Sequence, residues 1–433
     1  MIARRFVPSQ LEGVEDVEDY QPGGFHPVSL GDHFGQNRYR VVHKLGFGGS
    51  STVWLARDKR ASERLVTLKI LRASASSGNV NEFPALTIPK MLQANIPPSV
   101  GIQVVDDHFH VQGVNGSHLC LVSPFAGPSV LAMSDCPGRT LGSRRLRAAL
   151  ARDVSRQVAT AVCYMHRTGI VHGDVTTSNV LFALAPHVLQ WSDADLYAWL
   201  GEPETEMVRT SDGSAPPPHV PAELVAPIDN YKLTDTSLLQ ERVILGDFGQ
   251  SYAISSPPPG YEPGTVFNYI SPEARFEGRA GLEADVWALG CAIFEIRAGR
   301  PLFESFFGDD TDIMKQTVGM LGRLPDPWWA KFEGREAWFE ENGEPKSIEE
   351  QERAGVFIKA SKSSIRDQLR EIGTQDDPPP GDDGRMIERT GVTLPEREVE
   401  LLGDLLERML RYRPEERIKM DEVIKHPWFD FAD

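Results

Sequence analysis

The run His172-Gly-Asp174-Val-Thr-Thr-Ser-Asn179 places an aspartate and an asparagine five residues apart, just before an apolar stretch. An aspartate can accept the proton of an attacking hydroxyl group, and an asparagine oxygen can hold a divalent cation. Phosphoryl transfer needs both groups to face the same phosphate from one loop. The spacing therefore predicts Asp174 as a general base and Asn179 as a metal ligand.

A second acidic motif, Asp247-Phe248-Gly249, follows the apolar run Val-Ile-Leu-Gly. An aspartate at this place could chelate a Mg²⁺ ion that bridges the phosphates of a nucleotide. Each motif could be an ordinary turn when it is taken alone. The order of these two motifs after a glycine-rich turn and a lysine has no comparable structural explanation.

The glycine-rich turn joins the first two predicted strands, and the residues expected to bind ATP there are Gly46, Phe47, Gly48, Gly49, Ser50, Ser51 and Val53. A turn with little side chain lets backbone N–H groups approach a polyphosphate, although a tight hairpin explains the glycines about as well. Ser51 stands where the usual G-x-G-x-x-G motif has its third glycine. Lys69 ends the third predicted strand and supplies a cation suited to the α- and β-phosphates, which strengthens the ATP prediction.

The elements that must position these motifs fall into two groups. From Tyr39 to Leu71, three alternating runs rich in β-branched residues predict an antiparallel meander, and two further runs meet at the hairpin signal Asn115-Gly116. After Pro128 the pattern becomes helical. One helix face is formed by Leu146, Leu150, Val154, Val158, Val162 and Met165. Residues 283–299 and 398–412 predict two more helices, so the fold class is α+β with a mainly antiparallel-β lobe and a mainly helical lobe.

The predicted domain bounds are a polar N-terminal arm at 1–36, a first lobe at 37–125 and a second lobe at 126–433. The second lobe carries inserts at 183–242 and at about 305–385. The first insert holds one short helix candidate, which Ser192 and Asp195 open as a capping box. The second insert is irregular and rich in acidic clusters.

The composition limits the class of protein. The chain has 433 residues, 40% of them hydrophobic and 25% charged, which is typical of a soluble globular protein. Its formal charge of −17 disfavours direct nucleic-acid binding, because phosphate contacts need Lys and Arg. The 4 scattered cysteines predict reduced thiols. No apolar run approaches the ~18 residues that span a bilayer, so we expect no membrane association.

With these motifs in order, the sequence resembles the eukaryotic protein kinases over nearly its whole length. It also has Ser271-Pro-Glu273, Asp285-Val-Trp-Ala-Leu-Gly290 and Arg413-Pro-Glu-Glu-Arg417 at the places where the family has comparable motifs. The resemblance implies a bilobal kinase fold that uses ATP and Mg²⁺. It further implies a buried ion pair between Glu273 and Arg417, and structural support of the site by His172 and Asp285.

The resemblance narrows to the SR-protein kinases, and to their short fungal-type members. The residues that carry it are Tyr20-Gln-Pro-Gly-Gly-Phe-His-Pro-Val28, Gly46-Phe-Gly-Gly-Ser-Ser-Thr-Val-Trp54, Gly113-Val-Asn-Gly-Ser-His118, and Ile313-Met-Lys-Gln through Pro325-Asp-Pro-Trp328. It implies a monomeric serine/threonine protein kinase of the cytoplasm and nucleus that regulates mRNA splicing through basic, Arg/Ser-rich proteins. Acidic clusters at 309–312 and 340–344 fall where this family docks basic peptides, although a solvated face is at least as good an explanation.

Two departures from the family lie in the catalytic loop. Thr176 replaces the usual lysine two residues after Asp174, which removes a cation that neutralises the transferred phosphoryl group. Gly173 replaces the usual arginine, so we expect no control by phosphorylation of the activation loop.

A third departure concerns the glutamate that pairs with Lys69 in the family. Glu82 is the only nearby acid, but Ala85 stands at the aligned position. Pro84 and Pro89 disfavour a regular helix there, because neither has an N–H group to donate. These departures leave open an inactive pseudokinase that acts as a binding scaffold. A small-molecule kinase, suggested by the motif His-Gly-Asp, is disfavoured by the motifs at residues 271–273, 285 and 417, which support a protein-substrate platform.

Overall fold

The computed structural model describes residues 4–78, 82–134, 144–305, 308–376 and 384–432. Its chain divides into two compact units. The first comprises Met1–Lys90, Gln103–Pro128 and Phe182–Gln240, and the second comprises Met91–Ile102, Ser129–Leu181 and Glu241–Asp433.

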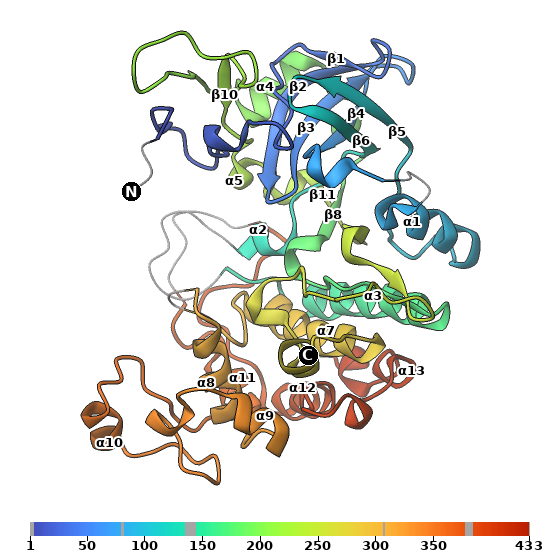
Figure 1. Ribbon diagram of the computed structural model, residues 1–433. Helices are drawn as coiled ribbons and strands as arrows, with labels where there is room; N and C mark the ends of the chain where they lie inside the picture. The colour runs from blue at the N-terminus through green and yellow to red at the C-terminus, as the bar shows by residue number, and fades with distance from the viewer. Residues whose placement is uncertain (1–3, 79–81, 135–143, 306–307, 377–383, 433) are drawn as a thin grey trace. The chain divides into compact units, whose positions relative to one another are not determined.

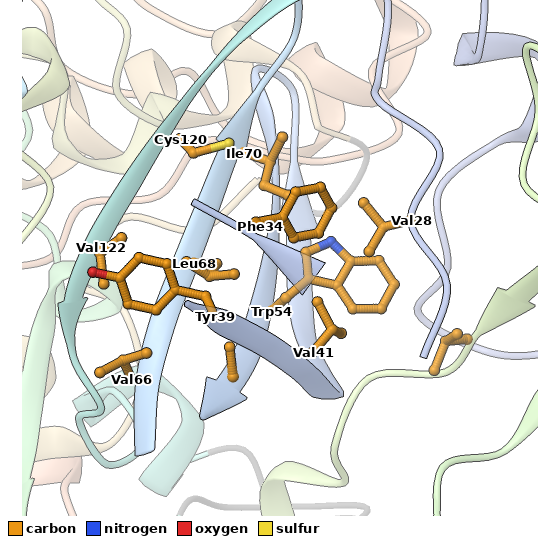
Figure 2. Packing of buried hydrophobic residues seen from close by; sticks show 12 residues of the cluster. Val28, Phe34, Tyr39, Val41, Trp54, Val66, Leu68, Ile70, Cys120 and Val122 are labelled. Atoms are coloured by element: carbon orange, nitrogen blue, oxygen red, sulfur yellow. The ribbon is translucent and has the colours of Figure 1, made fainter. Parts of the chain in front are cut away.

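A 6-stranded antiparallel sheet forms the centre of the first unit, in the order β1-β2-β3-β4-β6-β5 (Figure 1). Its strands are β1 (His33–Phe34), β2 (Tyr39–Gly48), β3 (Ser51–Asp58), β4 (Arg64–Leu71), β5 (Asp107–Gly113) and β6 (Gly116–Pro124). The predicted meander and the predicted hairpin around Asn115 are confirmed. Figure 2 shows the buried cluster on this sheet, where the rings of Phe34, Tyr39 and Trp54 lie among aliphatic side chains. These alternating apolar residues give the sheet its core face.

The segment that precedes the sheet packs into the first unit, whereas the sequence analysis expected a polar arm. Its apolar side chains form a cluster with residues of the distant 205–225 region, and the buried members are Phe6, Val17, Tyr20, Phe25, Val208, Val220 and Leu224. The apolar residues of the segment follow no helical or strand period. Their burial depends on partners about 190 residues away, which a local pattern cannot reveal.

The insert expected at 183–242 belongs to this same unit, as residues 182–240, whereas the sequence analysis placed it in the second lobe. The predicted helix is present as α4 (Asp193–Leu200), and Ser192 and Asp195 form its capping box. A short hairpin of β9 (Thr205–Met207) and β10 (Glu223–Val225) and the short helix α5 (Asn230–Leu233) complete the segment. The other predicted domain bounds remain predictions.

A regular helix forms where two prolines were expected to prevent one. Helix α1 (Pro84–Asn95) begins at Pro84 and contains Pro89. Proline at the first helical position costs little, because the first N–H groups of a helix have no partner within it. Pro89 removes only one internal hydrogen bond, and the burial of Leu86 and Leu92 stabilises the helix in spite of this loss.

Helices are the main regular elements of the second unit. They are α2 (Val130–Ser134), α3 (Ala148–Arg167), α6 (Pro272–Glu277), α7 (Leu282–Ala298), α8 (Asp310–Leu321), α9 (Asp326–Lys331), α10 (Ile348–Arg353), α11 (Ile365–Glu371), α12 (Glu396–Met409) and α13 (Met420–Val423). The three predicted long helices are confirmed as α3, α7 and α12. Helix α7 is buried continuously from Asp285 to Ala298, and α3 and α12 pack against it. Together with the sheet of the first unit, this confirms the predicted α+β class.

Short two-stranded pairings flank the catalytic motifs. Strand β7 (Ile170–Val171) pairs with β12 (Tyr252–Ala253), and β8 (Val180–Leu184) pairs with β11 (Leu239–Leu245). The last two strands contain the apolar runs that lie beside the motifs at Asp174 and Asp247 in the sequence. Among the described residues, no helix is both long and apolar enough to cross a bilayer.

The second insert is more regular than expected. Helices α8 to α11 lie within it, and an aromatic core forms from Trp328, Trp329, Phe332 and Phe339. The helices have 6 to 12 residues, so each shows too few turns for a clear apolar period.

Candidate active site

Buried hydrogen bonds hold the catalytic loop of the second unit. The His172 ring is fully buried, donates from Nε2 to the carbonyl of Gly246 at 3.1 Å, and accepts at Nδ1 the N–H of Asp174 at 3.2 Å. The buried carboxylate of Asp285 accepts the backbone N–H groups of His172 and Gly173 at 2.8 and 2.9 Å. Because these contacts fix the backbone from His172 to the N–H of Asp174, they set where the loop places the Asp174 side chain.

Asp174 and Asn179 are in direct contact. The side-chain nitrogen of Asn179 donates to the carboxylate oxygen Oδ2 of Asp174 at 2.7 Å and to its backbone carbonyl at 2.9 Å. Burial raises the pKa of Asp174 and outweighs the hydrogen bond from Asn179, which lowers it. A partly buried carboxylate with a raised pKa is a stronger proton acceptor than an exposed aspartate.

The motif at Asp247 lies beside this loop. The N–H of Gly246 donates to the carbonyl of Asn179 at 2.8 Å, and the negative charge of Asp247 contributes to the raised pKa of Asp174. Asp247 has a left-handed backbone, and its carboxylate accepts the N–H of Gly249 at 3.3 Å. Because the amide nitrogen of Asn179 is directed to Asp174, its side-chain oxygen remains for a cation. This oxygen and the Asp247 carboxylate are the hard donors that Mg²⁺ prefers, so the residues fit the ion.

The two departures in the loop have different structural settings. Gly173 has a φ of 81°, and a Cβ atom there would come within 2.7 Å of the carbonyl oxygen of Gln250. A side chain such as the family arginine therefore requires the backbone to change. Thr176 is 2% exposed, and its hydroxyl forms a 2.7 Å hydrogen bond with that of Ser178. The position of the missing lysine thus holds a satisfied neutral side chain.

The residues predicted to bind ATP in the first unit lie on β2, β3 and β4. The turn after Gly48 joins β2 and β3, and no atom of the described residues lies within 4 Å of a Cβ atom built on Gly48 or Gly49. The chain itself does not require glycine for space there, which leaves room for a ligand to approach the backbone. Lys69 is half-buried in β4, in register with Val53 on one side and Leu121 on the other. The ATP-binding roles of these residues remain predictions.

The structure places Glu82 just before helix α1, with an exposed side chain. Ala85, in the first turn of the helix, packs with Leu86 and Leu121 in a small apolar cluster. The aligned position of the family glutamate is therefore occupied by an apolar contact. The pairing of Glu82 with Lys69 remains a prediction.

The predicted ion pair between Glu273 and Arg417 is present and buried. The guanidinium group donates to both carboxylate oxygens at 2.7 and 2.6 Å, and the two residues are 1% and 3% exposed. This two-fold contact joins helix α6 to the segment that follows α12.

A buried hydrogen-bond network around Glu295 of helix α7 was not predicted from the sequence. The Tyr269 hydroxyl donates to Glu295, and the Thr177 hydroxyl donates to the same carboxylate at 2.9 Å. Burial raises the pKa of Glu295. The network connects the catalytic loop to helix α7 and, through Tyr269, to the segment that precedes α6. A glutamate within the otherwise apolar stretch from Val286 to Ile296 was the available sequence signal.

Many carboxylates in the two acidic clusters have basic partners within the second unit. Asp310 pairs with Arg275, and Asp312 pairs with Lys315 at 2.7 Å. In the second cluster, Glu341 pairs with Arg323 at 3.1 Å, while Glu344 pairs with Lys362 at 2.7 Å. These contacts reduce the free negative charge that each cluster presents.

Two protein-family models match adjoining parts of the chain. The model described as "Protein tyrosine and serine/threonine kinase" matches residues 39–237, and the model described as "Protein kinase domain" matches residues 233–429. The chain belongs to the protein kinase family. The matched ranges of this protein kinase contain the glycine-rich turn, the catalytic loop and the motif at Asp247.

Curated relatives indicate which group of protein kinases this chain is similar to. The serine/threonine-protein kinase SRPK of Physarum polycephalum is 25% identical over 426 residues, which cover 96% of this chain and 91% of that protein. Protein kinase dsk1 of Schizosaccharomyces pombe is 35% identical over 184 residues, 42% of this chain and 33% of that protein. SRSF protein kinase 3 of Homo sapiens is 31% identical over 207 residues, 45% of this chain and 35% of that protein. The chain thus spans nearly all of the first relative and about a third of the other two.

The predicted family is confirmed: this protein kinase is SR-protein kinase-like and belongs with the ATP-dependent serine/threonine protein kinases. All three relatives are named as protein kinases, so the comparisons give no support to the pseudokinase alternative or to a small-molecule kinase.

Proposed function

We propose that this chain transfers the γ-phosphoryl group of ATP to serine or threonine hydroxyls of basic, Arg/Ser-rich proteins. The observation that carries the proposal is the contact between Asp174 and Asn179 on a loop that His172 and Asp285 hold in place. A fixed carboxylate of raised pKa next to the side-chain oxygen of Asn179 provides a proton acceptor and a cation ligand in one site.

In the second unit, Asp174 would accept the proton of the substrate hydroxyl as it attacks. Asn179 and Asp247 would hold Mg²⁺, which supplies charge neutralisation at the phosphates when it is bound. In the first unit, the backbone N–H groups of residues 46–53 would bind the phosphates, and Lys69 would pair with the α- and β-phosphates.

The preference for a basic substrate is supported by Asp312 in helix α8. Its carboxylate is 7% exposed, and one oxygen pairs with Lys315 while the other, Oδ2, has no hydrogen-bond partner among the described residues. The residue lines two cavities, of about 350 and 170 Å³; Lys315 lines both with it, and Lys359 lines the smaller one. A buried carboxylate oxygen without a donor is unfavourable, so a guanidinium group that reaches Oδ2 from the larger cavity would gain a charge-assisted hydrogen bond against the repulsion of Lys315.

The cellular setting belongs to the same proposal. One relative is named an SRSF protein kinase, and kinases of such substrates work where splicing factors occur. We therefore expect the chain in the cytoplasm and the nucleus, acting as a monomer on protein substrates in the regulation of mRNA splicing.

The test measures transfer of labelled phosphate from Mg-ATP to a peptide of alternating Arg and Ser, and to the same peptide with Gln for Arg. We expect Asp174→Asn to reduce kcat by about 10²–10⁴-fold, the usual contribution of a general base. Asp153→Asn, a change on the exposed side of α3, serves as the matched control. An unchanged rate in Asp174→Asn would contradict the base assignment. Equal rates with the two peptides would contradict the basic-substrate assignment.

A further inference from the structure

Another cavity lies within the first unit, and none of the residues predicted for catalysis or ATP binding lines it. It has a volume of about 910 Å³ and is lined by Arg40 of β2, Arg57 of β3, the turn at residues 61–64 and the segment at residues 186–193. Figure 1 shows α4, which begins in that segment, beside the sheet. The volume falls within the usual range of small-molecule sites.

Two guanidinium groups in this cavity share one carboxylate. Arg40 and Arg57 are directly opposite in the register of β2 and β3, and both donate to Asp193, at 2.8 and 2.9 Å. Like charges directly opposite on paired strands repel, and one carboxylate neutralises only one of them. Burial tends to raise the pKa of Asp193, but these two hydrogen bonds outweigh burial and lower it, so the carboxylate remains charged.

Arg57 is the better buried of the two. Its side chain is 4% exposed, its Nε atom donates to Asp193 and its Nη1 atom donates to the carbonyl of Glu63 at 2.9 Å. Its Nη2 atom has no acceptor among the described residues. A buried charged donor without an acceptor costs free energy, and an anionic ligand could remove that cost.

Two further charged side chains, those of Arg64 and Glu63, lie at the cavity. Arg64 lines it as well, with a 43% exposed side chain that pairs with Asp106 at 2.9 Å, and Glu63 is exposed at its edge. Asp106 neutralises Arg64, and Glu63 is exposed to solvent that screens its charge. Arg40 and Arg57, which share the single carboxylate of Asp193, therefore leave one positive charge inside the cavity for a ligand with a single negative charge.

The other wall of the cavity is apolar. Pro186, Leu189 and Trp191 lie there, and the ring of Trp191 stacks on that of Trp199 at 5.7 Å between centroids. The adjoining turn has two consecutive non-glycine residues with positive φ, Ser62 at 53° and Glu63 at 56°. Such strained backbone often occurs where a chain forms a ligand site.

We propose that this cavity binds a carboxylate carried on an aromatic or otherwise apolar body. The carboxylate would accept hydrogen bonds from Arg40 and Arg57, and the apolar body would contact Trp191. The same chemistry can come from a free aromatic acid or from an acidic side chain beside aromatic residues in a peptide. The proposal does not depend on the kinase activity of the chain.

The test uses ligand-observed NMR and calorimetry with the full chain, at probe concentrations up to about 10 mM, where ligands with weak affinity are still detected. The first probe is 3-phenylpropionate, compared with its neutral amide and with acetate. The second is N-acetyl-Phe-Glu-Phe-amide, compared with the peptide that has Gln for Glu. Comparing the two acids tells which source of the carboxylate the cavity prefers.

We expect the charged probe to bind at least about tenfold more tightly than its amide, because a charge-assisted hydrogen bond is worth that much. Arg40→Gln should weaken binding by a similar factor. Arg209→Gln, at an arginine of the same unit with a 63% exposed side chain, should leave binding unchanged. The comparison of acid and amide needs no variant, so a poorly folded Arg40→Gln does not remove the test.

Three results would overturn the proposal. The first is that neither acid binds. The second is that an acid and its neutral analogue bind equally, which would mean that the arginines only hold helix α4 through Asp193. The third is that acetate binds as tightly as 3-phenylpropionate, which would mean that the cavity binds a simple anion and that Trp191 contributes nothing.

Discussion

The buried pair of Glu15 and Lys44 allows a direct test of whether the N-terminal segment is part of the folded core. Both side chains are at most 1% exposed, and the Lys44 ammonium group donates to the Glu15 carboxylate. The hydroxyl of Tyr20 donates to the same carboxylate. Burial lowers the pKa of Lys44, and the negative charge of Glu15 counteracts this shift. The perturbation is Glu15→Gln, which keeps the shape and an acceptor for Tyr20 but removes the charge.

The expected loss follows from leaving one buried charge unpaired. Glu15→Gln and Lys44→Met should each lower the free energy of unfolding by about 3–5 kcal/mol. The double variant Lys44→Met with Glu15→Gln contains no unpaired charge, so it should be more stable than either single variant. Glu12→Gln is the control, since Glu12 is exposed in the same segment, and it should change stability by less than about 0.5 kcal/mol.

Urea unfolding followed by tryptophan fluorescence measures these differences. Trp54 is a suitable reporter, because its ring centroid lies 5.5 Å from the Lys44 ammonium nitrogen. Strict additivity of the two single losses in the double variant would refute the reasoning, and so would a Glu15→Gln loss no larger than that of Glu12→Gln. Either result would mean that the segment does not contribute a buried ion pair to the unfolding free energy.

Two further predictions concern the first unit and helix α1. Burial lowers the pKa of His43 to about 4, so the folded state disfavours its protonation, and stability should fall as pH drops below the unfolded value near 6.5. Between pH 8 and 5 the native chain should lose roughly 2 kcal/mol more than His43→Asn, and parallel pH profiles in urea unfolding would contradict this. Pro89→Ala should stabilise the chain by about 1–2 kcal/mol, because it restores an N–H donor for the Ala85 carbonyl, a gain of about 3 kcal/mol that the loss of the buried Pro89 ring partly offsets. Pro84→Ala, at the first helical position, should give no such gain in the same thermal or urea measurement, and equal effects of the two changes would contradict the explanation.

Features with a local cause were predictable from the sequence. The apolar residues of α3 recur every three or four positions, and the alternation in β2, β3 and β4 marks the core face of the sheet. Asp174 and Asn179 also lie together within one short loop, so their spacing was sufficient to predict that they share one site, although not the hydrogen bond between them. Helix α4 was found from its capping box, which is a signal of four residues.

Features with a distant cause were not predictable. Phe6 and Val17 are buried by residues near position 220, and Glu15 is neutralised by Lys44. No period within residues 1–36 distinguishes these side chains from those of a solvated arm. In helix α1, tertiary burial of Leu86 and Leu92 outweighed the unfavourable prolines, which a propensity argument cannot anticipate.

The two catalytic-loop departures differ in what they imply for regulation and for rate. At Gly173 the left-handed backbone and the 2.7 Å approach of the Gln250 carbonyl exclude a side chain in this conformation. The absence of an arginine is therefore tied to the shape of the loop, and control through an arginine at this position would require a different backbone. At Thr176 the backbone is extended, with a φ of −125°, so it does not exclude a longer side chain, but the residue is 2% exposed and its hydroxyl bonds to that of Ser178. The absence of a lysine there removes a positive charge that would act on the transferred phosphoryl group, so we expect its consequence in kcat.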